Sequence, residues 1–190
     1  MVLDPPSYRG QLTDGRRLNA ALLRSAAQVI EDATLETGSI RGIPLYDGDV
    51  ETSTGIPQAV ADLKARMVAS DGVLLVTPEY NNGIPGVFKN AIDWLSRPAS
   101  DIRSVFGDRP VAVIGASPGG FGTILAQDAW LPVLRTLGMR PWFGGRLMAS
   151  RAHTLFDASG DLTDAALRRQ LTEFMRGFVA FVKARPAAPR

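Results

Sequence analysis

Two short apolar runs, at residues 72–77 and 110–115, carry the clearest strand pattern in the chain. Each has a core of four aliphatic residues, mostly β-branched or leucine, bounded by Gly, Pro or Thr. Such runs are typical of strands buried on both faces, as in a parallel sheet covered by helices on both sides. Further strands are predicted near 34–40 and 139–143, and a short or atypical first strand is predicted before Ser7.

Helical periodicity separates these runs. Apolar residues recur at spacings of three and four over residues 18–30 and 84–95, and again in the last helix, for which Thr163 is the predicted N-cap. Another helix is expected over about 124–137, with a kink or break at Pro132. Because strands alternate with helices, the sequence predicts an α/β fold, with a doubly wound, five-stranded parallel sheet in the flavodoxin-like order 2-1-3-4-5.

The composition is that of an ordinary globular protein. The 190 residues include 21 Lys and Arg and 19 Asp and Glu, for a net charge of +2. We expect one domain over residues 1–184 and a disordered tail over 185–190. Basic residues are interspersed with acidic ones, which argues against nucleic-acid binding. No apolar stretch approaches the ~18 residues of a membrane span, and the N-terminus lacks a secretory signal pattern, so no membrane partner and a cytoplasmic location are predicted.

The scarcity of Cys and His narrows the chemistry. The chain has no Cys and one His, which excludes a disulfide framework, a thiolate nucleophile and a Cys- or His-built metal site, so no metal is predicted. A serine hydrolase would need His153 paired with Ser117 or Ser150, and the Gly-x-Ser-x-Gly elbow is missing. We therefore expect His153 to be an ordinary, partly exposed loop residue and the three Trp side chains to be core or interface aromatics.

Ligands of doubly wound sheets lie outside the carboxyl ends of the strands, where the strand order reverses. This rule places residues 5–19, 78–84 and 117–123 at the predicted ligand edge. The loop at 78–84 combines turn formers with an aromatic ring and two amides. Gly83 and Gly86 permit unusual backbone conformations and close approach, so backbone N–H groups could bind a flat heterocycle. The same composition also suits a plain strand-to-helix turn.

This loop and the helix after it also carry a family signature. Residues 78–81 read Pro-Glu-Tyr-Asn, and residues 84–94 read Ile-Pro-Gly-Val-Phe-Lys-Asn-Ala-Ile-Asp-Trp. The pattern closely resembles that of NAD(P)H-dependent FMN reductases, a family of chromate, quinone and azoreductase-like enzymes on a flavodoxin-like fold. The resemblance implies FMN as the cofactor and NAD(P)H as the co-substrate. It also implies that the flavin ring is held by Pro78, Glu79, Tyr80, Asn81 and Asn82.

The loop at 117–123 fits the same resemblance. The family has a similar Ser-Pro-Gly-Gly-type segment that faces the other edge of the flavin. The Ser117 hydroxyl can donate to a ring oxygen, and Gly119 and Gly120 suit close approach of the backbone to a planar ligand.

The first loop departs from the family pattern. The family places a Gly-Ser-Leu-Arg-like phosphate loop after a full first strand, whereas this chain has Pro5 and Pro6 there, and prolines remove two N–H donors. Three explanations stay open: the first strand lies upstream of this chain, the loop binds phosphate in another way, or tight FMN binding has been lost. We expect FMN binding to be retained, with the phosphate half of the site formed by Ser7, Arg9, Arg17 and Asn19.

Together these features predict an FMN-dependent NAD(P)H oxidoreductase. Hydride would pass from the nicotinamide to the flavin, and electrons would then pass to a quinone, flavin, metal-oxyanion, ferric or azo acceptor in a ping-pong scheme. Similarity to the family also implies a homodimer or homotetramer. The alternative is a flavodoxin-fold binding or scaffold protein that has lost tight FMN binding and turnover because of its atypical phosphate loop.

Overall fold

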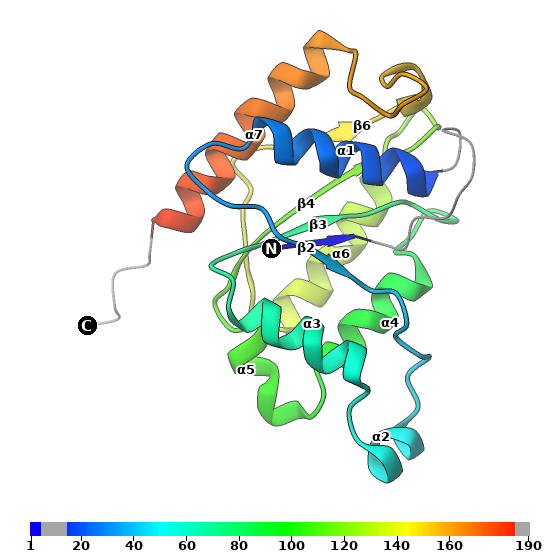
Figure 1. The fold of residues 1–190 in the computed structure, drawn as a ribbon, viewed down its shortest axis with the longest axis vertical. Helices are drawn as coiled ribbons and strands as arrows, with labels where there is room; N and C mark the ends of the chain where they lie inside the picture. The colour runs from blue at the N-terminus through cyan, green and yellow to red at the C-terminus, as the bar shows by residue number, and fades with distance from the viewer. Residues whose placement is uncertain (5–14, 185–190) are drawn as a thin grey trace.

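The computed structural model of this protein describes residues 1–4 and 15–184, and its centre is a parallel sheet (Figure 1). The sheet has the order β2-β1-β3-β4-β5, which is the predicted flavodoxin-like order. All four residues of β3 are buried, as expected for a strand covered on both faces. These strands are β1 (Val2–Asp4), β2 (Thr37–Ser39), β3 (Val73–Val76), β4 (Pro110–Ala116) and β5 (Arg140–Pro141).

The first strand is present in the structure, although it is only three residues long. Val2 pairs with Thr37 of β2 on one side and with Leu74 of β3 on the other, and it is fully buried. The prediction of a short first strand is confirmed, and the open explanation in which this strand is missing from the chain was wrong. A brief apolar segment suffices here because both of its edges are paired in the middle of the sheet.

The fifth strand position is divided between two short strands. β5 pairs with the start of β4, and β6 (Met148–Ala149) pairs with the end of β4. Between them the chain leaves the sheet, and the Trp142 ring packs edge-on against Phe174, with the ring centroids 4.7 Å apart. The predicted strand over 139–143 is thus shorter than expected, and the sequence did not predict β6.

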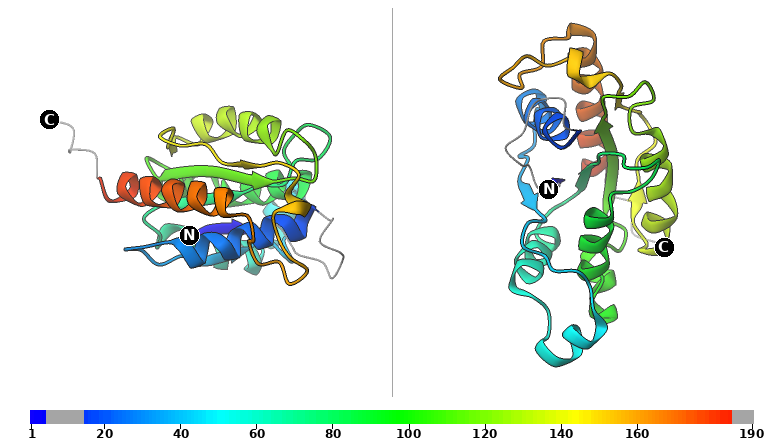
Figure 2. Two further views of the ribbon diagram at one scale, coloured as in Figure 1. Left: turned by 90° about the horizontal axis from the view of Figure 1, so that it is seen from above. Right: turned by 90° about the vertical axis from the view of Figure 1, so that its right-hand side faces the viewer.

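The helices form two layers, one on each face of the sheet (Figures 1 and 2). The two apolar cores, one on each side of the sheet, match this division. The first face is covered by α1 (Gly15–Val29) and α7 (Ala165–Lys183), and the second by α3 (Gln58–Val68), α4 (Gly86–Leu95) and α6 (Ile124–Thr136). The shorter helices are α2 (Gly48–Thr54), α5 (Ile102–Val105) and the 3₁₀ turns η1 (Ala99–Asp101) and η2 (Ala152–Thr154).

The predicted N-cap of the last helix was wrong, and α6 has no break at Pro132. The N-cap of α7 is Asp164, whose Oδ1 accepts from the Leu167 N–H at 2.7 Å, whereas the Thr163 hydroxyl donates to the Leu155 carbonyl. Pro132 lies inside α6, and the helix continues through it. An Asp at the N-cap is at least as favourable as a Thr, so the cap of α7 lies one residue later than predicted and still agrees with local preference.

Two of the three tryptophans lie in the core of the protein. Trp94 and Trp130 are fully buried, so they are core aromatics as predicted. Within the described ranges, no helix combines the length and the apolar character that a membrane crossing requires.

Candidate functional site

The loop after β3 forms a tight two-residue turn at the carboxyl edge of the sheet. The Tyr80 N–H donates to the Gly83 carbonyl at 3.2 Å, and the Gly83 N–H donates back to the Tyr80 carbonyl at 3.0 Å. Asn81 and Asn82, between them, have φ angles of 49° and 62°. Two left-handed residues in succession are typical of a type I′ turn, and Asn tolerates this conformation better than most residues. The unusual conformations that we expected at Gly83 and Gly86 therefore occur at the two asparagines.

A buried hydrogen-bond chain anchors the base of this loop. The Trp130 indole N–H donates to the Thr77 hydroxyl at 3.3 Å, and that hydroxyl donates to the Pro78 carbonyl at 2.8 Å. Thr77 and Pro78 are buried, whereas Asn81 and Asn82 are exposed. The loop therefore has a fixed base and presents its polar tip to the surroundings.

The side chain of Glu79 connects this loop to the helix that follows the loop at 117–123. Its Oε2 accepts from the Ala126 N–H in the first turn of α6 at 2.9 Å. α6 directly follows the loop at 117–123, and the N-cap residue Thr123 makes no side-chain capping bond. The carboxylate of Glu79 therefore lies at a helix N-terminus, where a negative charge is favourable, and the predicted contact of Glu79 with the flavin stays a prediction.

The loop after β4 is held on its other side by β6 and the turn that follows it. The Ser117 N–H donates to the Ala149 carbonyl at 3.0 Å, and the Ala152 N–H donates to the Ser117 carbonyl at 3.0 Å. The Arg151 N–H donates to the Gly119 carbonyl at 2.8 Å. The sequence did not single out Arg151, which adopts a left-handed conformation with φ of 48°. A left-handed backbone conformation at a non-glycine residue is uncommon and would have drawn attention to Arg151. The amino-acid sequence alone does not reveal backbone angles, so it gave no such signal.

The middle of the same loop presents bare backbone. Gly119 and Gly120 are exposed, and a Cβ added at Gly120 would meet nothing within 4 Å. A Cβ at Gly119 would meet only the Ser117 hydroxyl, at 3.8 Å. A planar molecule can therefore approach the peptide groups of these glycines closely, which is the property expected of a loop that faces a flavin.

Asn19 holds the end of β4, from which this loop begins. It is fully buried on α1, its Nδ2 donates to the Ala116 carbonyl at 2.7 Å, and its Oδ1 accepts from the Ala116 N–H at 2.9 Å. Ala116 is the last residue of β4, directly before Ser117. Asn19 therefore supports the loop at 117–123, and its predicted contact with the FMN phosphate stays a prediction.

The remaining candidates for the phosphate half of the site lie outside the described residues. This holds for Ser7, Arg9 and the side chain of Arg17, and their roles stay predictions. His153 lies in η2 and is exposed, as expected for an ordinary surface histidine.

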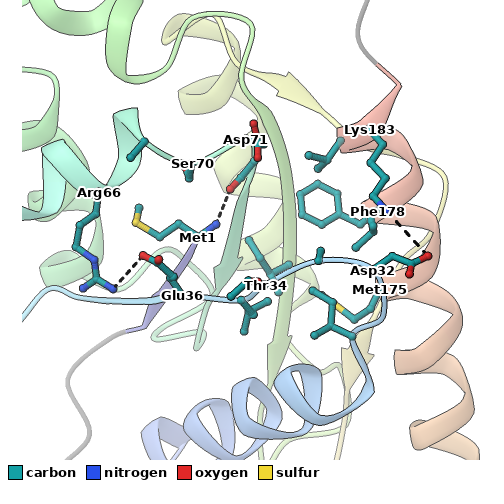
Figure 3. A pocket seen from close by; sticks show the side chains of 18 residues that line it. Met1, Asp32, Thr34, Glu36, Arg66, Ser70, Asp71, Met175, Phe178 and Lys183 are labelled. Atoms are coloured by element: carbon teal, nitrogen blue, oxygen red, sulfur yellow. Dashed lines mark hydrogen bonds and ion pairs between the residues drawn. The ribbon is translucent and has the colours of Figure 1, made fainter.

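A cavity of about 380 Å³ opens at the opposite end of the sheet (Figure 3). It is lined by Met1 and Gly72, which precede β1 and β3, together with the 30–36 segment and the end of α7. At its rim, Arg66 lies 3.7 Å from Glu36, in an exposed pair that contributes little to stability. Because ligands of such sheets bind beyond the carboxyl ends of the strands, this cavity does not belong to the candidate site.

Known proteins are similar in sequence to this chain over most of its length. The model of the NADPH-dependent FMN reductase family matches residues 10–154. An NAD(P)H-dependent FMN reductase from Pseudomonas aeruginosa is 37% identical over 174 residues, which cover 92% of this chain and 92% of that protein. A 2-hydroxy-1,4-benzoquinone reductase from a Burkholderia species is 35% identical over 154 residues, which cover 81% of this chain and 82% of that protein.

A solved structure agrees with these relatives. The flavoenzyme NAD(P)H:(acceptor) oxidoreductase FerB from Paracoccus denitrificans superposes with a TM-score of 0.76 at 30% identity, covering 96% of each chain. A WrbA-like flavodoxin from Agrobacterium tumefaciens, 16% identical with a TM-score of 0.58 and covering 96% of this chain and 95% of that one, supports the fold alone. The resemblance inferred from residues 78–94 is confirmed, and this chain belongs to the NADPH-dependent FMN reductase family.

Proposed function

We propose that this protein is an NAD(P)H oxidoreductase that uses FMN and delivers electrons to a small quinone. The observation that carries the proposal is the pairing of two loops at the carboxyl edge of the sheet. The loops at 78–83 and 117–120 follow neighbouring strands, and the bond between Glu79 and Ala126 ties them together. The family match and the flavoenzyme relatives support FMN as the cofactor and NAD(P)H as the reductant.

The residues present fit a flavin ring. The exposed turn at Asn81 and Asn82 offers amide groups, while Gly119 and Gly120 offer uncovered peptide groups, and Ser117 adds a hydroxyl. Such groups can donate to the carbonyls and nitrogens of a flat heterocycle, and donors fixed in advance stabilise negative charge on it. Tyr80, with 39% of its surface exposed, lies beside the turn and can flank the ring.

Bound FMN would supply the redox chemistry, by accepting hydride and releasing electrons, and the protein residues would bind and orient the reactants. The rigid base formed by Trp130, Thr77 and Pro78 keeps the first loop in place, and Asn19 keeps the second loop in place. We propose a ping-pong order, in which NAD(P)⁺ leaves before the acceptor enters the same exposed site. Parallel lines in double-reciprocal plots at several acceptor concentrations would support this order, and intersecting lines would refute it.

The choice of a quinone as acceptor comes from the relatives. The 2-hydroxy-1,4-benzoquinone reductase and quinone reductases from Pseudomonas putida, at 34–36% identity, are relatives whose names give a quinone as the acceptor. Benzoquinones are small and flat, and they suit an open site floored by exposed glycine backbone. Flavin, chromate, ferric chelate and azo dye are the competing acceptors, and a comparison of kcat/KM across these classes tests the choice.

We also propose that the protein forms a homo-oligomer through the surface around the start of α4. Leu45 and Val87 are 80% and 51% exposed. Leu45 lies in a segment that is bound to α4, because Asn90 of that helix accepts from the Tyr46 N–H and donates to the Pro44 carbonyl. Exposed apolar groups of this kind mark association surfaces. Light scattering after size exclusion tests the state, and a monomer at micromolar concentration would refute the proposal.

Titration of the apoprotein with FMN tests the whole proposal. We expect saturable binding, an absorbance band near roughly 450 nm after removal of free FMN, and NAD(P)H oxidation that requires bound FMN. If the protein stays colourless after incubation with excess FMN and oxidises no NAD(P)H, the proposal that it is an FMN-dependent oxidoreductase is refuted. That result would support a binding or scaffold role instead.

A further inference from the structure

Glu79 carries the single formal charge in the two loops that form the candidate flavin site. The segments at 78–83 and 117–123 together contain one acidic residue, Glu79, and no Lys, Arg or His. All their other polar groups are amides, hydroxyls and peptide groups. The charge of Glu79 therefore has a large influence on the electrostatic potential at this edge of the sheet.

The structure explains how this charge is held in place. The first turn of every α-helix leaves N–H groups without an intrahelical partner, and a Ser or Thr at the N-cap usually accepts from one of them. In α6 the N-cap residue Thr123 is buried, and its hydroxyl accepts from the Gln127 side chain instead, at 3.0 Å. The Ala126 N–H is taken by Glu79, which is 47 residues away in the chain.

A neutral acceptor could satisfy the Ala126 N–H equally well. A carboxylate does more, because it places a negative charge where the two loops meet. Glu79 is partly buried, so solvent screens its charge less than that of an exposed carboxylate. Arg151, whose N–H donates to the Gly119 carbonyl, brings a positive charge to the turn beside the second loop.

We propose that Glu79 is a positioning residue that also weakens the binding of reduced FMN relative to oxidised FMN. This inference rests on the proposed function. Hydride transfer from NAD(P)H adds two electrons and one proton to FMN and releases NAD(P)⁺, so the ring gains one negative charge. A fixed carboxylate near the ring opposes this gain, keeps the flavin a stronger reductant, and favours delivery of the electrons to the acceptor.

The size of the effect follows from Coulomb's law. Two unit charges about 10 Å apart interact, at an effective dielectric constant of about 20, strongly enough to shift an equilibrium by roughly tenfold. We therefore expect removal of the Glu79 charge to raise the ratio of the Kd for oxidised FMN to the Kd for reduced FMN by about tenfold. For a two-electron couple, a tenfold change corresponds to a rise of about 30 mV in the midpoint potential.

The decisive comparison uses Glu79→Gln, because the Gln side chain has the same length and keeps an oxygen that can accept from Ala126. The Kd values of oxidised FMN and of chemically reduced FMN are measured anaerobically with the apoprotein, and the midpoint potential is measured with the loaded protein. Asp128→Asn is the matched control, since Asp128 is an exposed carboxylate on α6, the helix whose N-terminus Glu79 contacts. We expect the ratio to rise about tenfold in Glu79→Gln and to stay within about twofold in Asp128→Asn.

A second variant tests the contact without any flavin. In the apoprotein of Glu79→Ala, hydrogen exchange of the Ala126 amide should be about five- to tenfold faster than in Glu79→Gln, because the bond is lost. Equal exchange in the two variants would show that the contact is not made and would overturn the proposal.

The outcomes separate this proposal from the proposed function. A wild-type protein that binds no FMN refutes the proposed function and this inference with it. A wild-type protein that binds FMN, combined with a ratio in Glu79→Gln that stays within about twofold of wild type, refutes the role of Glu79 alone.

Discussion

Replacement of Asn19 by Ala is the sharpest test of how the candidate site is built. The Asn19 side chain makes two hydrogen bonds to the backbone of Ala116, at 2.7 and 2.9 Å, in a fully buried position. The substitution removes both bonds and leaves the N–H and the carbonyl of Ala116 without these partners. Each buried polar group left unpaired costs about 1–3 kcal/mol, so we expect the free energy of unfolding to fall by about 2–5 kcal/mol.

Urea and thermal unfolding of the apoprotein measure this change. For a domain of about 150–250 residues, 1 kcal/mol lowers the Tm by about 2–4 °C, so a loss of about 2–5 kcal/mol corresponds to about 4–20 °C. Ser25→Ala is the control, because Ser25 is a buried hydroxyl on the same helix that donates only to the Ala21 carbonyl one turn earlier. A loss in Asn19→Ala below about 1 kcal/mol, no larger than in the control, would show that the amide does not support the end of β4.

Three further predictions follow from the described contacts. Gly115→Ala places a Cβ 2.2 Å from the Thr123 hydroxyl oxygen and from the Thr77 carbonyl oxygen, so it should lower the free energy of unfolding by about 1–3 kcal/mol or more. Gly120→Ala places a Cβ that meets nothing within 4 Å, so in the same urea titration it should change the free energy of unfolding by under about 0.5 kcal/mol. His153→Ala should keep NAD(P)H oxidation by the FMN-loaded protein within about threefold of wild type, because the side chain is exposed, and a loss above about tenfold would make it an acid or base. Lys64 donates to Asp101 at 2.9 Å and lowers its pKa, so Lys64→Met should lower the Tm at pH 7. The difference should be full above the unfolded pKa of about 4 and should shrink as the pH falls below it through the lower folded pKa. A difference that is constant from pH 7 to pH 3 would contradict the last of these.

Much of the fold was predictable because its signals are local. The apolar runs at 72–77 and 110–115 are β3 and β4, and the periodicity at 84–95 is α4. A strand buried on both faces has no polar positions, and a helix that covers a sheet repeats its apolar positions at three and four, so both leave a record in the order of residues.

The short elements were harder to predict because their partners decide them. β1 has three residues and forms a strand because β2 and β3 lie on either side of it. β6 has two residues and forms only because the end of β4 offers it an edge. Neither segment is long enough to show a period of its own.

The sequence by itself determined the family of this protein, the strand order of its sheet and the loops at which its ligand is expected. Those conclusions depend on residue identity and spacing, which a linear chain displays. The tertiary structure alone decided the roles of individual side chains: Glu79 pairs with the N-terminus of α6, Asn19 holds the end of β4, and the left-handed turn falls on Asn81 and Asn82. The physical reason is that a hydrogen bond between residues 47 or 97 positions apart depends on which elements the packed core brings together, and no local pattern encodes that distance.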